Sequence, residues 1–179
     1  MIIMKNEMSD LALALTGEYD YKGAYLFVSG EGDAVLRSRI ACAAFTALTA
    51  AAYVAGGLSG ALGAARVYVM IPYIALALPI ALMIASLVYA IPFAKKMTPL
   101  QYKRGFRRMF SASWFALGLA ILSEIAEILF TALICPKEER GGELVLICSL
   151  AAVAVLVTVF LSFQKRIPIK STEEEKNET

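Results

Sequence analysis

The stretch that decides the fold is VYVMIPYIALALPIALMIASLVYAIPF, residues 67–93, which contains no charged side chain. At about 1.5 Å per residue, a helix over this stretch is long enough to cross the roughly 30 Å hydrocarbon core of a bilayer. Three further apolar blocks occur, at residues 40–58, 110–134 and 144–163. Because each has the length and apolar character of a spanning helix, the sequence predicts an all-α integral membrane protein, a four-helix transmembrane bundle.

Composition agrees with this prediction and excludes several classes of protein. Of the 179 residues, 59% are hydrophobic and only 18% are charged. A soluble domain has about 45–50% apolar and about 25% charged residues, so a soluble globular domain and a disordered chain are both excluded. The length excludes a large transporter with a dozen spans. The net charge of +2 indicates no particular partner.

The residue types needed for common catalytic sites are missing. The chain contains no histidine, which excludes Ser-His-Asp and Cys-His nucleophilic sites and histidine-bound zinc or haem. No GxSxG elbow, Walker motif or CxxC pair occurs either. We therefore expect a protein that is not an enzyme, with no catalytic, cofactor or metal site.

Basic residues predict the orientation in the membrane. Fourteen of the 17 Lys and Arg residues lie in residues 1–39, 94–109 and 164–179, and the other three are Arg66, Lys137 and Arg140. Positive residues remain on the cytoplasmic side of a membrane. We expect both termini and the 94–109 connection in the cytoplasm, with short outer loops at 59–66 and 135–143. The predicted location is the cytoplasmic or plasma membrane.

Three domains follow from this reading. Residues 1–36 form a cytoplasmic arm, residues 37–164 the transmembrane domain, and residues 165–179 a disordered cytoplasmic tail. Alternating aromatic residues along 18–28 indicate a short strand or extended stretch in the arm. The arm either lies against the cytoplasmic face or docks a partner.

A helix lying at the membrane interface is predicted over residues 99–109, leading into the third span. Thr98 and Pro99 are typical of a helix start. Aromatic residues recur every four positions from Tyr102 to Trp114, and cations occupy the other faces: Lys103, Arg104, Arg107 and Arg108. This pattern would place the aromatic rings at the level of the lipid headgroups and the cations beside anionic lipid. The expected partner is therefore membrane lipid and not nucleic acid.

Small residues in the first span predict close helix packing. Ala51, Ala55, Gly56 and Gly60 would let another helix backbone approach closely, either within the chain or between chains. Cys135 and Cys148 flank the last outer loop. They are either a disulfide or two inert thiols.

Two acidic residues in the third span are its most costly feature. Glu124 and Glu127 share one helical stripe with Ser113, Ala120 and Thr131. This stripe should face the bundle interior or a water-filled cleft, because a carboxylate exposed to lipid costs several kcal/mol. Three roles are open: pairing with Arg66, binding of a proton or cation, and contact with a cation of a partner subunit.

The function expected from these features is that of a non-enzymatic accessory or interaction subunit, associated with itself or with a larger membrane complex. The alternative is a small oligomeric proton- or cation-coupled transporter or channel that uses Glu124 and Glu127. An intramembrane enzyme ranks third.

Overall fold

The computed structural model describes residues 26–28, 32–90, 102–135, 140–167 and 169–171. Four long helices form most of this part of the chain: α2 (Gly32–Gly57), α3 (Val67–Ala90), α5 (Arg108–Leu133) and α6 (Arg140–Lys165). Two short helices and two short strands complete the described structure: η1 (Gly63–Ala65), η2 (Lys103–Arg107), β1 (Leu26–Val28) and β2 (Ile169–Ser171).

Each long helix is sufficiently long and apolar to cross a membrane. The all-helical architecture with four candidate spans, predicted from the apolar blocks, is therefore confirmed. The third candidate span begins at Lys103, because η2 runs directly into α5. The helix predicted to lead into this span is present from there onward, although its first turn is a π-helix, and residues 99–101 lie outside the described part.

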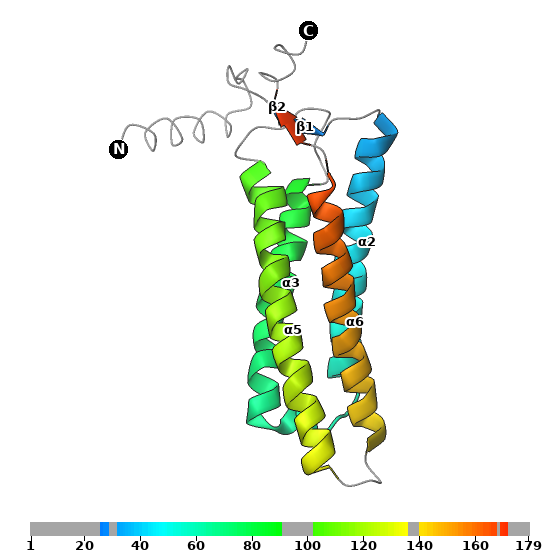
Figure 1. The fold of residues 1–179 in the computed structure, drawn as a ribbon, viewed down its shortest axis with the longest axis vertical. Helices are drawn as coiled ribbons and strands as arrows, with labels where there is room; N and C mark the ends of the chain where they lie inside the picture. Colours follow the sequence, from blue (N-terminus) through cyan, green and yellow to red (C-terminus); the bar gives the residue numbers. More distant parts are fainter. Residues whose placement is uncertain (1–25, 29–31, 91–101, 136–139, 168, 172–179) are drawn as a thin grey trace, which may run out of the picture.

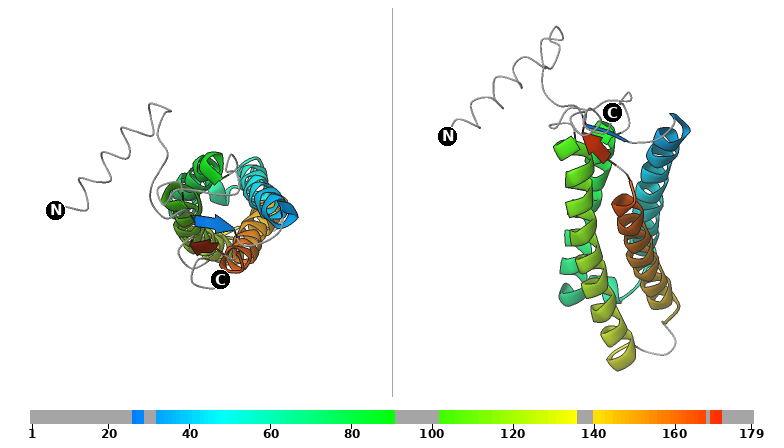
Figure 2. Two further views of the ribbon diagram at one scale, coloured as in Figure 1. Left: turned by 90° about the horizontal axis from the view of Figure 1, so that it is seen from above. Right: turned by 45° about the horizontal axis from the view of Figure 1, so that its top comes forward.

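The four helices form a closed bundle in which sequence neighbours are not always the main partners. Helix α3 packs on α5, α5 on α6 and α6 on α2, whereas α2 and α3 touch each other less (Figures 1 and 2). Helix α2 is therefore diagonal to α5. The close fit of α2 on α6 depends on Gly56, because a Cβ there would meet Leu146 Cδ1 and Ser149 Cβ at 3.3 Å and collide with the Ser149 hydroxyl.

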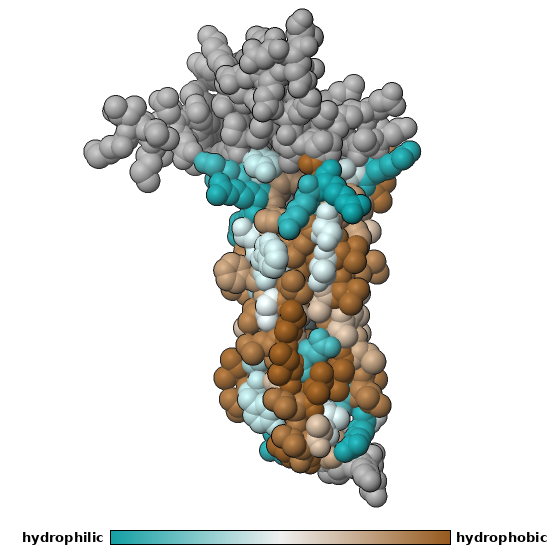
Figure 3. All heavy atoms as spheres, viewed as in Figure 1, coloured by the Kyte–Doolittle hydropathy of each residue, from teal (hydrophilic) through white to brown (hydrophobic). Residues whose placement is uncertain are grey.

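The interior of the bundle is apolar along most of its length. Helix α5 contributes the small residues Ala112, Ala116 and Ala120, and larger side chains from α3 and α6 fill the space beside them: Leu76, Met83, Leu150, Val153 and Val157. Several buried hydroxyls in the bundle donate to carbonyls of their own helix, as Ser113 does to Met109 and Ser123 to Leu119. Many large hydrophobic side chains are also exposed on the outside of the helices, and the face seen in Figure 3 is largely apolar over the middle of the bundle, which suits helices that face lipid.

Strands β1 and β2 lie together at one end of the bundle, here called the strand end (Figure 1). They pair in antiparallel fashion, with Phe27 opposite Lys170. Strand β1 falls in the part of the arm expected to be extended. The tail differs from the expectation of disorder from residue 165, because α6 continues through Lys165 and Ile169–Ser171 pair with β1. Backbone hydrogen bonds to a distant segment order these residues, which no pattern within the tail reveals.

Candidate functional site

Glu127 lies in the bundle interior, toward the end opposite the strands. Its side chain on α5 has 0% exposure, and Ser113 and Ala120 on the same stripe are also fully buried. The prediction that this stripe faces inward is confirmed for Glu127. Glu124, one turn earlier, is only half-buried and stands at the edge of the stripe.

A second buried carboxyl group, not singled out from the sequence, belongs to Glu143. It lies in the first turn of α6 and has 0% exposure. The backbone N–H of Leu62 donates to Glu143 Oε1 at 2.7 Å, and that of Gly63 donates to Oε1 at 3.2 Å and Oε2 at 3.3 Å. The carboxylate thus supplies the acceptor that these amides at the start of η1 otherwise lack.

Two glycines allow these groups to approach so closely. A Cβ on Gly142 would lie 3.1 Å from the Ser59 carbonyl oxygen, so the loop before η1 packs directly on the start of α6. A Cβ on Gly63 would lie 2.7 Å from Glu127 Oε1 and 2.8 Å from its Cδ. Glu127 and Glu143 both lie against Gly63. Glu127, Glu143 and Gly63 are called the carboxyl site below.

One oxygen of the carboxyl site has no hydrogen-bond donor. Thr131 Oγ1 donates to Glu127 Oε1 at 3.4 Å, which is a long hydrogen bond. Glu127 Oε2 is buried and has no hydrogen-bond partner. A buried polar atom without a partner is unfavourable by about 1–3 kcal/mol, so this oxygen is the unsatisfied atom of the carboxyl site.

Arg66 does not pair with either predicted glutamate. Its guanidinium carbon lies 5.7 Å from the centre of the Phe130 ring, and no ion pair within 4.0 Å joins it to Glu124, Glu127 or Glu143. Arg140, the other described cation at this end, makes no such pair either, and its Nε is buried without a partner. The expectation that Arg66 pairs with Glu124 or Glu127 is therefore wrong. Arg66 lies over the ring of Phe130, and Glu143 accepts hydrogen bonds from backbone amides.

We expect Arg66→Gln to lower the free energy of unfolding in detergent by about 0.5–1 kcal/mol, the usual value of an exposed cation–aromatic contact. Combined with Glu127→Gln, its effect should be additive, because the two side chains do not interact. Thermal unfolding of the two single variants and the double variant measures this. If the double variant were more stable, by over about 1 kcal/mol, than the sum of the two single effects predicts, an interaction between Arg66 and Glu127 would be supported after all.

The packing residues predicted in the first span divide into two groups. Gly56 packs on α6, as predicted. Gly60 lies beyond the helix in a turn with φ of 67° and has open space around it, so it contributes no helix contact. Ala51 and Ala55 are exposed on the outside of α2. Their face is free of contacts within the bundle because α2 meets α6 through its opposite side.

The remaining predicted residues lie at the strand end or carry no site. Arg104, Arg107 and Arg108 are exposed around the start of α5, as is Lys103, and Trp114 lies lower on the same helix. Cys135 is buried, Cys148 is exposed, and no disulfide joins them.

The carboxyl site has too few ligands for a typical metal centre. Among the described residues, no group of three His, Cys, Asp or Glu side chains is placed to hold a metal ion. The sequence signal for Glu143 was weak, since an acidic residue in the first turn of a helix is common and favourable there. Comparison with protein families, with curated proteins and with solved structures finds no match to this chain.

Proposed function

We propose that this chain is a non-enzymatic multi-pass membrane protein that binds a proton or a monovalent cation at the carboxyl site and acts as a small oligomeric transporter or channel. The observation that carries the proposal is the buried, donorless Glu127 Oε2 beside the fully buried Glu143. Ionisable groups buried within a membrane bundle mark ion or proton pathways more often than other positions do.

The chemistry of the pair favours a small positive ligand. Two ionised carboxylates close together and shielded from water repel each other, and each also loses its hydration. The backbone N–H groups of Leu62 and Gly63 already donate to Glu143, so its oxygens have the hydrogen-bond donors that Glu127 Oε2 lacks. A proton held on Glu127 Oε2 would remove the second charge and supply the missing donor toward Glu143. A monovalent cation between the two groups would neutralise them in a similar way.

The orientation completes the proposal. The strand end, which bears most of the described basic residues, would face the cytoplasm by the positive-inside rule. The carboxyl site then lies near the outer boundary, covered by the connection that contains η1. This connection joins α2 to α3, the pair of helices in least contact around the bundle. Movement of the η1 connection would open the site to the outer solution.

Proton flux into liposomes tests this function. The purified protein is reconstituted with a pH-sensitive dye inside, and a pH gradient is applied. We expect wild type to conduct protons and Glu127→Gln to fall to the level of empty liposomes while remaining folded, because the amide cannot exchange a proton. Glu124→Gln removes the same charge one turn away and should retain flux. The same assay with sodium and potassium gradients distinguishes a cation from a proton.

Absence of any flux from wild type, or equal flux from wild type and Glu127→Gln, would contradict a transport role. It would favour the second candidate, an accessory subunit of a membrane complex. One observation supports that candidate: Ala44, Ala47, Ala51 and Ala55 form an exposed line of small residues along α2. In lipid, such a face suits close packing against another helix.

A further inference from the structure

We propose that the strand ends of α5 and α6 form a binding site for the headgroup of an anionic phospholipid, built on Trp114 and Lys165. The proposal is independent of the carboxyl site, which lies toward the other end of the bundle. It specifies one place on the bundle surface, whereas the sequence predicts only a general basic interface.

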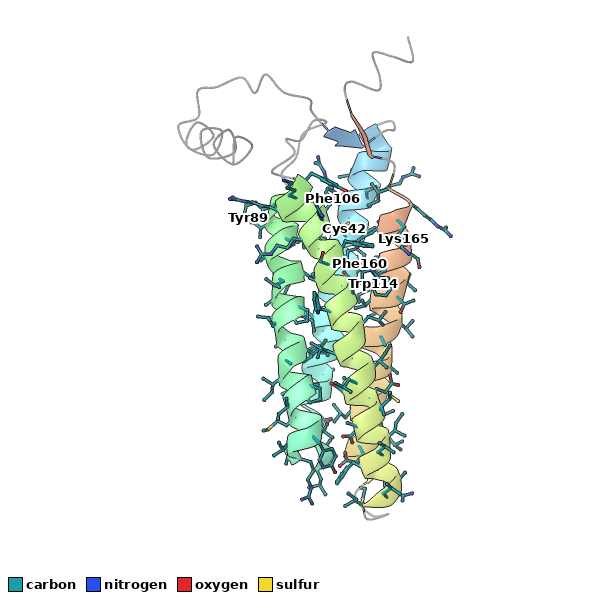
Figure 4. The ribbon with its side chains drawn as sticks, turned by 60° about the vertical axis from the view of Figure 1, so that its left-hand side comes forward. Cys42, Tyr89, Phe106, Trp114, Phe160 and Lys165 are labelled. Carbon is teal, nitrogen blue, oxygen red and sulfur yellow. The ribbon has the colours of Figure 1, made fainter. Side chains whose placement is uncertain are left out.

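The contact between Trp114 and Lys165 bridges the two helices. Lys165 Nζ, in the last turn of α6, lies 5.9 Å from the centre of the Trp114 ring on α5 (Figure 4). The ring attracts the ammonium group and holds it near the seam between the helices, while its N–H donors stay available. Trp114 keeps 51% exposure, so its ring also presents a surface to the surrounding lipid.

Additional cations lie at the same end of α5 and α6 as this contact. Four exposed arginines lie at the same end of α5 and α6: Arg104, Arg107, Arg108 and Arg166. None of them forms an ion pair within 4.0 Å with an acidic side chain of the described residues. The acidic residues of α5 and α6 themselves, Glu124, Glu127 and Glu143, lie toward the other end. Cations grouped between spanning helices near the cytoplasmic surface are typical of sites for anionic lipid headgroups.

The arrangement of polar and apolar groups favours a lipid over a soluble phosphate. Trp114 is six positions after Arg108, or about 9 Å further into the membrane along the helix. Phe115 beside it is 69% exposed. Cations above and exposed aromatic rings below therefore match the two parts of a phospholipid, its phosphate and the upper part of its acyl chains. A soluble anion would use only the cations.

The single tryptophan provides a direct test, since Trp114 is the source of all tryptophan fluorescence. The full chain is reconstituted in two preparations of phosphatidylcholine vesicles. One contains a fraction of brominated phosphatidylglycerol, and the other contains the same fraction of brominated phosphatidylcholine. In both, the bromine atoms lie near the headgroup end of the acyl chains. We expect brominated phosphatidylglycerol to quench Trp114 more strongly. Lys165→Gln should reduce this preference about fivefold, the usual contribution of one basic residue near an anionic surface. Unbrominated vesicles serve as the reference for each variant.

Arg37→Gln is the matched control, because it removes one exposed charge at the same end but from α2, which is diagonal to α5. It should leave the preference unchanged. Excess inorganic phosphate at constant ionic strength should also leave it unchanged. Equal quenching by the two brominated lipids in wild type would overturn the proposal. So would equal losses in Lys165→Gln and Arg37→Gln, which indicate a diffuse basic surface, or displacement by inorganic phosphate, which indicates a soluble ligand.

Discussion

Replacing Glu143 with leucine is expected to lower the free energy of unfolding in detergent by about 3 kcal/mol. Two backbone N–H groups, those of Leu62 and Gly63, would lose their acceptor at the start of η1. A buried donor left without an acceptor is destabilising by about 1–3 kcal/mol, and two donors are affected here. Thermal or denaturant unfolding followed by circular dichroism measures the loss.

The same series should show opposite behaviour at the neighbouring carboxyl group. Glu127→Gln should be neutral or stabilising, because the amide nitrogen can donate to Glu143 and the glutamine is uncharged. Glu124→Gln, half-buried and outside the carboxyl site, is the matched control and should change stability by less than about 0.5 kcal/mol. If Glu127→Gln and Glu143→Leu were equally destabilising, the assignment of Glu143 as the backbone-held carboxylate would be rejected.

Replacing Gly56 with valine should also be strongly destabilising, by about 2–3 kcal/mol. Its Cβ would already collide with the Ser149 hydroxyl, and two further methyl groups would press on Leu146. The fit of α2 on α6 would then have to loosen, and overpacking of this kind costs about 1–3 kcal/mol. In lipid or detergent, the loss of close contact is not offset by a hydrophobic driving force between helices.

Gly118→Val is the control for this substitution. Gly118 lies within α5, and a Cβ there would meet nothing within 4 Å. Valine has a higher helix propensity than glycine, so this variant should equal or exceed wild type in stability. Unfolding midpoints of both variants in the same detergent give the comparison. Equal destabilisation at the two positions would show that the α2–α6 contact does not depend on Gly56.

The carboxyl site was only partly predictable from the sequence. The burial of Glu127 was correctly predicted from its helical stripe, because the cost of exposing a carboxylate to lipid depends only on its place in an apolar helix. Glu143 escaped notice because it stands at the boundary of its span, where acidic residues are ordinary. Its acceptor role depends on Leu62 and Gly63, which are 81 and 80 positions away. The role assigned to Arg66 failed for a related reason, since the position of the Phe130 ring is a tertiary property.

The four helices themselves were determined by the sequence. In an apolar solvent every backbone N–H and C=O group must find its hydrogen-bond partner within the protein. A single uncharged stretch such as residues 67–93 achieves this by forming a helix. Which helices touch was decided by the tertiary structure. Because all four helices are apolar, hydrophobicity does not determine which of them pack together. The shapes of their surfaces do. The missing side chain at Gly56 lets α2 pack on α6, and the missing side chain at Gly63 lets the η1 connection lie against Glu127 of α5 and Glu143 of α6. Only this packing creates the carboxyl site.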